Sequence, residues 1–263
     1  MRTPFLLRAT LAALAACALG AGSARAYPNA VVFAPSGDVK GQGQAAFLMA
    51  AGLYGGNPVT WEGFNVGLLP SMAYGESGLS FGGLEVGCDA SSFVGQTPAI
   101  KVNFNAKLQL LCETGLVPSL AVGTMQHALF TPERSLKMTY ASLSKTLNWG
   151  ETGLGRLTLG GAQNAPAAAD LFVPTAPFDA SSKGCLMAGY ESPAFGPCYL
   201  AVDHVGGISE VGGTYAALNL QTGPGTYAGV VYALSNDRSV VGGDSVWFYI
   251  SAGWDTLKAF SGR

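Results

Sequence analysis

The sequence predicts an all-β fold: a closed antiparallel up-and-down barrel that spans a membrane, with about 12 strands and a range of about 10 to 14. Strand-like runs of about ten residues recur along the chain, polar and apolar residues alternate within them, and long connections alternate with short ones. Charged residues make up 11% of the chain, against about 25% in an average soluble protein. A lipid-facing wall explains this low charge, and a secreted all-β domain with a large core is the alternative.

The N-terminus is typical of a secretory signal peptide. A basic leader precedes an apolar stretch at 9–22, and ARA at 24–26 has the small-x-small form of a cleavage site. We expect cleavage before Tyr27, which removes residues 1–26. The LAAC motif ending at Cys17 resembles a lipobox, so lipidation of Cys17 is the alternative. Either route takes the chain out of the cytoplasm.

The mature chain divides into a short lead-in and a barrel. We expect residues 27–43 to form a periplasmic lead-in or a partial plug, and 44–263 to form an outer-membrane β-barrel. Helical periodicity is absent after residue 26, and about ten tilted residues suffice for a strand to cross a bilayer. The expected strands are 44–53, 62–73, 78–88, 103–112, 117–126, 137–147, 154–162, 184–190, 198–204, 211–220, 227–234 and 245–254.

The connections predict which end of the barrel faces outward. GGNPVTWE, DASSFVGQTPAIK and APAAADLFVPTAPFDASSK follow the first, third and seventh expected strands, whereas YGES, ETGL, NWGETG and TGPGT follow the second, fourth, sixth and tenth. Short periplasmic turns that alternate with long extracellular loops are typical of outer-membrane barrels. A β-sandwich does not sort its connections in this way.

The cost of placing charge in lipid assigns the two faces of each strand. A Lys or Arg at the bilayer midplane costs about 2–4 kcal/mol, so charges in mid-strand should face the lumen. In NFNAKLQLL at 103–111, Lys107 then faces inward with every second residue, and Phe104 and Leu108 face lipid. The stretch 137–147 fits no clean register, because Lys145 shares a face with Leu143. The candidates for lining the lumen are Glu85, Asn103, Asn105, Lys107, Gln109, Arg156 and Asp203.

Small inward residues predict a narrow, water-accessible lumen instead of a packed plug of side chains. These residues are Ser119, Ala121, Gly123, Gly160, Gly229 and Ala233. In such a pore, Lys107 and Arg156 would bias which ions pass, because charges along a pore set its selectivity. The alternative is that they pair with inward acids such as Glu85 and Asp203 and brace the wall.

Four cysteines remain after cleavage: Cys88, Cys112, Cys185 and Cys198. The expected strands place Cys88 and Cys112 at opposite ends of the barrel, roughly 30 Å apart at about 3.3 Å per residue. Disulfides need Cα atoms within about 7 Å. A bond between Cys88 and Cys185 through the extracellular loops is the one possible pairing.

The sequence contains few patterns typical of catalytic, metal or cofactor sites. The chain has 2 histidines and lacks G-x-S-x-G, H-E-x-x-H and C-x-x-C patterns. We therefore expect no enzyme, no metal and no cofactor. His127 and His204 lie at expected extracellular strand ends, but neither has the Ser two residues away that lipid-modifying barrel enzymes carry. The balance of 14 basic and 16 acidic residues argues against a nucleic-acid partner.

One region resembles a known group of proteins. CLMAGYESPAFGPCYLAVDHVGG, followed by GTYAALNLQTGPGTYAGVVYAL, is similar to paired strands of small bacterial outer-membrane, porin-like barrels of poorly defined function, over residues 184–234. The resemblance implies a Gram-negative outer membrane, with lipid, the barrel-assembly machinery and small solutes as partners. Such barrels usually end on an aromatic residue, whereas this chain ends AFSGR.

The expected function is a narrow porin-like pore for passive passage of small solutes. A non-conducting structural or surface-interaction barrel is the alternative, and a lipid-modifying enzyme is the third. The solute, the oligomeric state and the physiological role stay open at this point.

Overall fold

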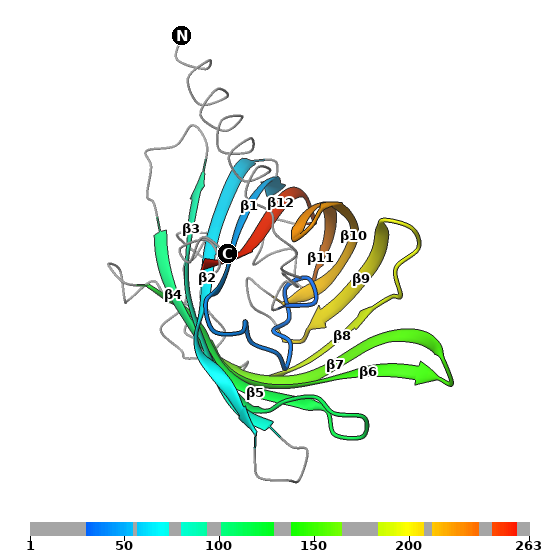
Figure 1. Ribbon diagram of the computed structural model, residues 1–263. Coiled ribbons are helices and arrows are strands. Elements are labelled where there is room, and N and C mark those ends of the chain that lie inside the picture. Colours follow the sequence, from blue (N-terminus) through cyan, green and yellow to red (C-terminus); the bar gives the residue numbers. More distant parts are fainter. Residues whose placement is uncertain are drawn as a thin grey trace.

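The computed structural model describes residues 30–54, 57–73, 80–93, 101–128, 138–164, 184–207, 212–236 and 244–256. They form a closed barrel of 12 strands, in which each strand pairs antiparallel with its neighbours in sequence and β1 pairs with β12 (Figure 1). The strands are β1 (Gln44–Tyr54), β2 (Asn57–Ala73), β3 (Ser80–Phe93), β4 (Lys101–Leu111), β5 (Ser119–Ala128), β6 (Met138–Trp149), β7 (Thr152–Asn164), β8 (Gly184–Glu191), β9 (Cys198–Val205), β10 (Gly213–Gly223), β11 (Thr226–Ser235) and β12 (Ser245–Asp255). The predicted fold class is confirmed.

The two faces of each strand follow the period-two alternation of the sequence. In β4, Asn103 and Lys107 are 2% and 5% exposed, while Phe104 and Leu108 are 37% and 40% exposed. Side chains of a strand point alternately to opposite faces, so the polar set faces the interior and the apolar set faces outward. Closing the sheet leaves no strand edge unpaired, which is what a barrel in lipid requires.

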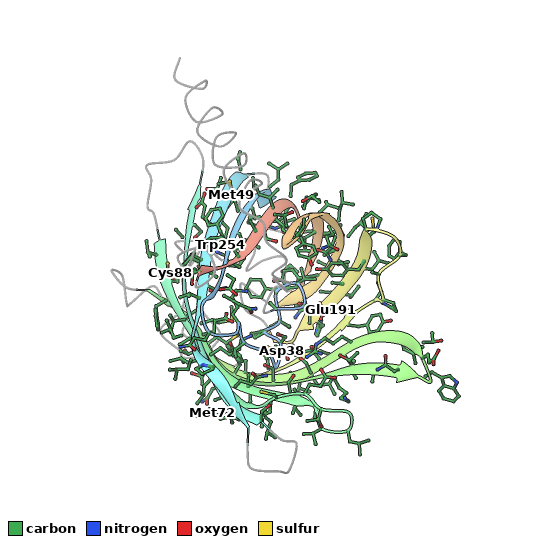
Figure 2. The ribbon with its side chains drawn as sticks, in the orientation of Figure 1. Asp38, Met49, Met72, Cys88, Glu191 and Trp254 are labelled. Atoms are coloured by element: carbon green, nitrogen blue, oxygen red, sulfur yellow. The ribbon has the colours of Figure 1, made fainter. Side chains whose placement is uncertain are left out.

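Large apolar side chains cover the outer wall (Figure 2). Leu159 on β7, Leu200 on β9 and Phe248 on β12 are exposed by 50%, 48% and 66%. In water such a continuous apolar surface would drive aggregation, whereas in hydrocarbon it is the favourable one. No helix among the described residues is long and apolar enough to cross a bilayer.

The barrel has two distinguishable ends. We call the end where β1 begins and β12 finishes the terminal end, and the opposite one the loop end. By the strand bounds, the residue numbers between strands that meet at the terminal end are 74–79, 112–118, 150–151, 192–197 and 224–225, and those between strands that meet at the loop end are 55–56, 94–100, 129–137, 165–183, 206–212 and 236–244. Most of the expected alternation of connection length is therefore present.

The first connection differs from the sequence-based expectation. GGNPVTWE was expected to form a long loop, but Asn57 already begins β2 and only 55–56 connect it to β1. Val59 is 1% exposed and Thr60 pairs with Ala51, so this stretch alternates and pairs as a strand. Pro58, the second residue of β2, lies within this paired stretch, opposite Leu53 of β1.

The stretch without a clean register is also explained. Met138, Tyr140, Ser142 and Ser144 of β6 are buried, so their face is the interior one. Lys145 lies on the opposite face near the terminal end, where its Nζ donates to Glu113 Oε1 at 3.1 Å. A charged residue can lie on the outer face there because Glu113, in the turn between β4 and β5, forms an ion pair with it.

The proposed disulfide between Cys88 and Cys185 is wrong. Both cysteines are free, as are Cys112 and Cys198. Cys88 lies on β3 and Cys185 on β8, with β4 to β7 between them on one side of the ring. Cys88 is moreover exposed on the outer wall, opposite Phe64 and Phe104 of the adjacent strands, and points away from the interior.

Candidate functional site

The interior of the barrel contains part of the chain itself. Residues 31–43, which we call the lumen segment, run inside the ring of strands before β1 begins (Figure 1). Val31 is 3% exposed and Ala34 is fully buried, although neither belongs to a strand. Residues 31–43 of the expected lead-in or partial plug therefore lie in the interior, where they occupy much of the space that the small wall residues leave.

The first half of the lumen segment packs through apolar contacts. Val31 joins a cluster with Ala201 and Val231, and Phe33 stacks on Tyr215 with ring centroids 5.3 Å apart. The wall is shaped to receive these groups. A Cβ added at Gly189 of β8 would lie 2.7 Å from Val31 Cγ2, so a glycine is needed where the segment passes.

Inward tyrosines fill other positions where small residues were expected to leave water. A Cβ at Gly123 would lie 2.5 Å from the hydroxyl of Tyr140, and a Cβ at Gly229 would lie 2.5 Å from the ring of Tyr249. Small residues on one strand thus make room for rings on the next. Side chains as well as the segment narrow the interior.

Asp203 on β9 holds the turn of the lumen segment. Its Oδ2 accepts the backbone N–H groups of Val32, Phe33 and Ala34, at 2.8, 2.6 and 2.7 Å. Consecutive backbone N–H groups that converge in this way form an anion-binding concavity. The carboxylate is 1% exposed, so these three donors replace the water that it loses on burial.

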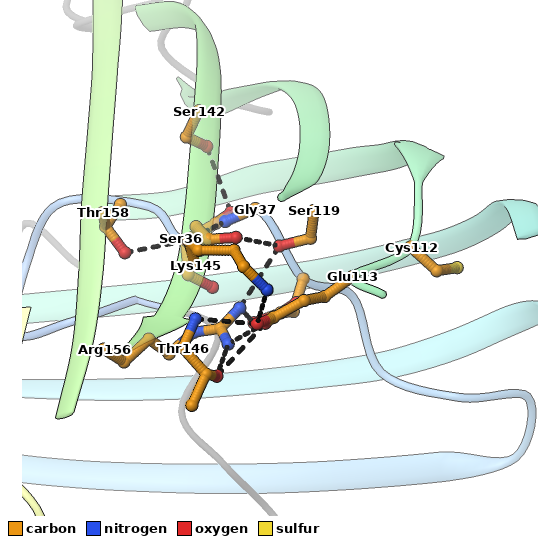
Figure 3. Close-up of polar contacts among 12 residues, drawn as sticks. Ser36, Gly37, Cys112, Glu113, Ser119, Ser142, Lys145, Thr146, Arg156 and Thr158 are labelled. Atoms are coloured by element: carbon orange, nitrogen blue, oxygen red, sulfur yellow. Dashed lines mark hydrogen bonds and ion pairs between the residues drawn. The ribbon is translucent and has the colours of Figure 1, made fainter. Parts of the chain in front are cut away.

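The middle of the lumen segment is bonded to β4 and β6. The carbonyl of Ser36 accepts from Ser142 Oγ at 3.1 Å and from Lys107 Nζ at 3.2 Å. Gly37 N donates to Ser144 Oγ at 2.8 Å (Figure 3). Lys107, whose role was left open, therefore holds carbonyl groups of the segment.

Two further wall residues complete these contacts. Lys107 Nζ also donates to the carbonyl of Asp38 at 2.9 Å, and Gln109 Nε2 donates to that of Gly37 at 3.3 Å. Glu85 Oε2 accepts the backbone N–H of Lys40 at 2.9 Å. Burial lowers the pKa of the Lys40 ammonium, an effect that the charge of Glu85 partly offsets.

A cluster of charges closes this region at the terminal end (Figure 3). We call it the Arg156 cluster: Asp38, Glu113, Lys145, Thr146 and Arg156. Arg156 Nη2 pairs with Asp38 Oδ2 at 2.5 Å, and Arg156 Nη1 pairs with Glu113 Oε2. The guanidinium thus joins the lumen segment to the turn after β4. Glu85 lies directly opposite Lys107 on the neighbouring strand, whereas the acids that pair with Arg156 are Asp38 and Glu113.

The Arg156 cluster changes the pKa of Glu113. Burial alone would raise its pKa, but the backbone N–H of Thr146 and the side chains of Arg156 and Lys145 bond to the carboxylate. The net effect lowers the pKa of Glu113 below its ordinary value. Thr146 N lies 2.7 Å from Glu113 Oε1.

Asn103 and Asn105 belong to a different group of the interior. Their amides donate to Asp89, with Asn103 Nδ2 at 3.0 Å from Oδ1 and Asn105 Nδ2 at 2.6 Å from Oδ2. The seven lumen candidates thus divide. Glu85, Lys107, Gln109, Arg156 and Asp203 contact the lumen segment, and the two asparagines support Asp89.

Sequence reasoning missed the partners of these residues. Asp38, Glu113, Ser142 and Ser144 carry no motif, and their contacts join positions up to 118 residues apart. The available signal was the composition of 30–43, AVVFAPSGDVKGQG, which is too apolar at its start for a solvated lead-in.

Two cavities flank the lumen segment. The larger, of about 590 Å³, opens near the terminal end between the segment and β6 to β12. Arg156, Glu191, Tyr199 and Trp254 are among its lining residues. Asp38 and Glu191 are labelled in Figure 2. The smaller, of about 220 Å³, lies on the side of β1 to β4, where Trp61 and Asp89 line it.

Candidate metal ligands do not cluster in the part of the chain that the structure describes. No group of three or more His, Cys, Asp or Glu side chains is placed there to hold a metal ion. His204 is exposed, and its Nδ1 lies 3.0 Å from Thr214 Oγ1 on the neighbouring strand. The side chain of His127 lies outside the described set.

These features define the class of protein. A closed antiparallel barrel with an apolar outer wall and a polar interior is an outer-membrane β-barrel. No protein-family model matches the chain, and no curated protein matches its sequence.

Solved structures of similar architecture include the KdgM porin, at 7% identity and a TM-score of 0.46, where the match covers 80% of this chain and 98% of that one. The NanC porin matches at 9% identity and a TM-score of 0.45 over 78% and 97% of the two chains. An outer membrane channel from Pseudomonas putida F1 matches at 10% identity and a TM-score of 0.41, over 82% of this chain and 97% of that one. At such low identity, the function of this chain has to be derived from its own residues.

Proposed function

We propose that this chain is a narrow, porin-like pore for the passive passage of small solutes, in which residues 27–43 act as a partial plug. The observation that carries the proposal is the space left in the interior beside the lumen segment. A cavity of about 590 Å³ lies beside the lumen segment and is lined by charged groups and aromatic rings. A barrel that served only as a structural element would gain stability by filling this volume with side chains.

The lumen segment limits the size of what can pass. It occupies the centre of the interior, so a solute has to use the space beside it or displace it. Arg156, Glu191 and Lys40 all line the larger cavity and would act on charged solutes there.

Single-channel recording of the purified full chain in planar bilayers tests this proposal. We expect small, discrete conductance steps from the wild type. Gly37→Val should increase them, because a Cβ at Gly37 would lie 2.7 Å from the Ser119 carbonyl oxygen and 2.9 Å from Ser144 N. Gly115→Val is the matched control, since a Cβ there meets nothing within 4 Å. A folded barrel that stays closed in all three forms would favour the non-conducting alternative.

A further inference from the structure

Most of the hydrogen bonds described between the wall of the barrel and the lumen segment involve backbone groups of that segment. Backbone N–H groups of Val32, Phe33, Ala34, Gly37 and Lys40 donate to the wall, and the carbonyls of Ser36, Gly37 and Asp38 accept from it. The wall partners are the side chains of Glu85, Lys107, Gln109, Ser142, Ser144 and Asp203. Such groups recognise any chain that presents the same backbone.

From this arrangement we propose that the lumen is a binding site for short unfolded peptides, and that the lumen segment occupies it as an internal ligand. The proposal deepens the pore function above, on which it rests, by naming the class of solute. Backbone contacts supply the affinity, as they do when a peptide adds to a sheet edge, and pockets for individual side chains supply the selectivity.

The pockets along the segment define which peptides fit. An aromatic ring is accepted between Tyr215 and Trp61, whose ring centroids lie 5.3 and 5.7 Å from that of Phe33. Small residues are required next, since Ala34 is fully buried and Ser36 is 3% exposed. Glycine is required at the position of Gly37, where a Cβ would collide with Ser119.

Charge adds one more element of selectivity. Asp38, which follows that glycine, pairs with Arg156 at 2.5 Å. A ligand with an acidic residue directly after the glycine reproduces this ion pair. The favoured class is thus a peptide with an aromatic residue, then small residues and proline, then glycine and an acid.

The test uses the full chain with its own segment dislodged. Gly37→Val removes the segment from the wall while leaving every wall residue intact, and Ala34→Leu does so at an independent position. The probe is a synthetic, fluorescently labelled peptide of the sequence AVVFAPSGDVK, which corresponds to residues 30–40. Binding is followed by fluorescence anisotropy in detergent micelles, and heat-modifiable gel mobility verifies that each variant is a folded barrel.

We expect the peptide to bind Gly37→Val and Ala34→Leu at least about tenfold more tightly than it binds the wild type or the Gly115→Val control. N-methylation of the peptide at the residues matching Phe33 and Ala34 keeps both side chains and removes two donors to Asp203. It should weaken binding by at least about tenfold. Adding Asp203→Leu to Gly37→Val should abolish binding of the unmodified peptide.

Several results would overturn the proposal. If the peptide bound the wild type and all variants equally, or if the N-methylated peptide bound as tightly as the unmodified one, the wall would not recognise the peptide backbone. In the wild type, saturating peptide has to displace the segment and so accelerate hydrogen exchange in residues 31–40, and unchanged exchange would also refute it. Anisotropy needs no current, so a barrel that conducts without binding peptide refutes only this inference, and one that binds peptide without conducting refutes only the pore.

Discussion

Asp203 offers the sharpest test of how the lumen segment is held. Its Oδ2 accepts three consecutive backbone N–H groups, while no partner of its Oδ1 is found among the described residues. Asp203→Asn can place its one carbonyl oxygen at the position of Oδ2 and keep all three acceptor contacts without the charge. Asp203→Leu fills a similar volume and removes the acceptor altogether.

The expected magnitudes differ strongly between these two variants. Hydrogen bonds to charged groups contribute about 1.5–3 kcal/mol each, and those between neutral groups about 0.5–1.5 kcal/mol. Asp203→Asn should therefore weaken docking of the segment by roughly 3 kcal/mol over three bonds. Asp203→Leu leaves three N–H groups without an acceptor, one buried and two part-buried. At about 1–3 kcal/mol for each group, and less where water reaches it, the total is at most about 9 kcal/mol.

Hydrogen exchange followed by mass spectrometry measures this docking directly. At about 1.4 kcal/mol per tenfold change, Asp203→Asn should accelerate exchange in residues 31–40 by about a hundredfold. Asp203→Leu should bring it close to the rate of an unprotected chain, while β1 to β12 stay protected. Unchanged protection of the segment in Asp203→Leu would refute the role of the carboxylate. Equal loss of protection in the strands would show that Asp203 stabilises the whole barrel instead.

Three further outcomes are expected. Arg156→Gln should free the lumen segment from the turn after β4, because Arg156 pairs with both Asp38 and Glu113. The substitution should therefore lower the thermal unfolding midpoint and raise single-channel conductance. An altered reversal potential at unchanged stability would instead assign Arg156 to ion selection. Because the pKa of Glu113 is lowered in the folded barrel, its stabilising effect is complete above its ordinary value of 4.5 and is lost as the pH falls through the lowered value. The gap in unfolding midpoint between wild type and Glu113→Gln should therefore be constant at neutral pH and close in acid, and a gap that widened in acid would contradict the direction of the shift. Cys88, exposed among apolar neighbours on the outer wall, should react in membranes with a lipid-soluble maleimide and resist a charged one, and equal labelling by both would place this wall in water.

The wall of the barrel was predictable because each strand repeats a simple constraint. In β4 the alternation around Lys107 assigns the faces, since only one of them can meet lipid without burying a charge there. The same reasoning failed in β6, where Lys145 lies near the strand end. There Glu113, in the turn between β4 and β5, bonds to Lys145 and lets it lie on the outer face. No sequence pattern within β6 indicates this contact.

The interior was harder to predict because its contacts join distant parts of the sequence. Small residues such as Gly123 and Gly189 leave space, but the sequence does not say whether water, a ring or a chain segment takes it. Tyr140 fills the first space and Val31 the second. A strand-by-strand reading assigns Asp203 to the lumen and cannot show that its ligand is the backbone of residues 32–34.

The way the segment is held also determines how it can leave. Val31, Phe33 and Ala34 pack against apolar groups of the wall, and a polar solute cannot replace these contacts. From Ser36 onward the contacts are hydrogen bonds and the ion pair with Arg156, which competing polar groups can replace one at a time. Displacement should therefore begin at the polar half, near the larger cavity, and reach the Asp203 contacts last. A solute that lacks peptide-like donors and acceptors has no means of starting that exchange and would pass only through the space beside the segment.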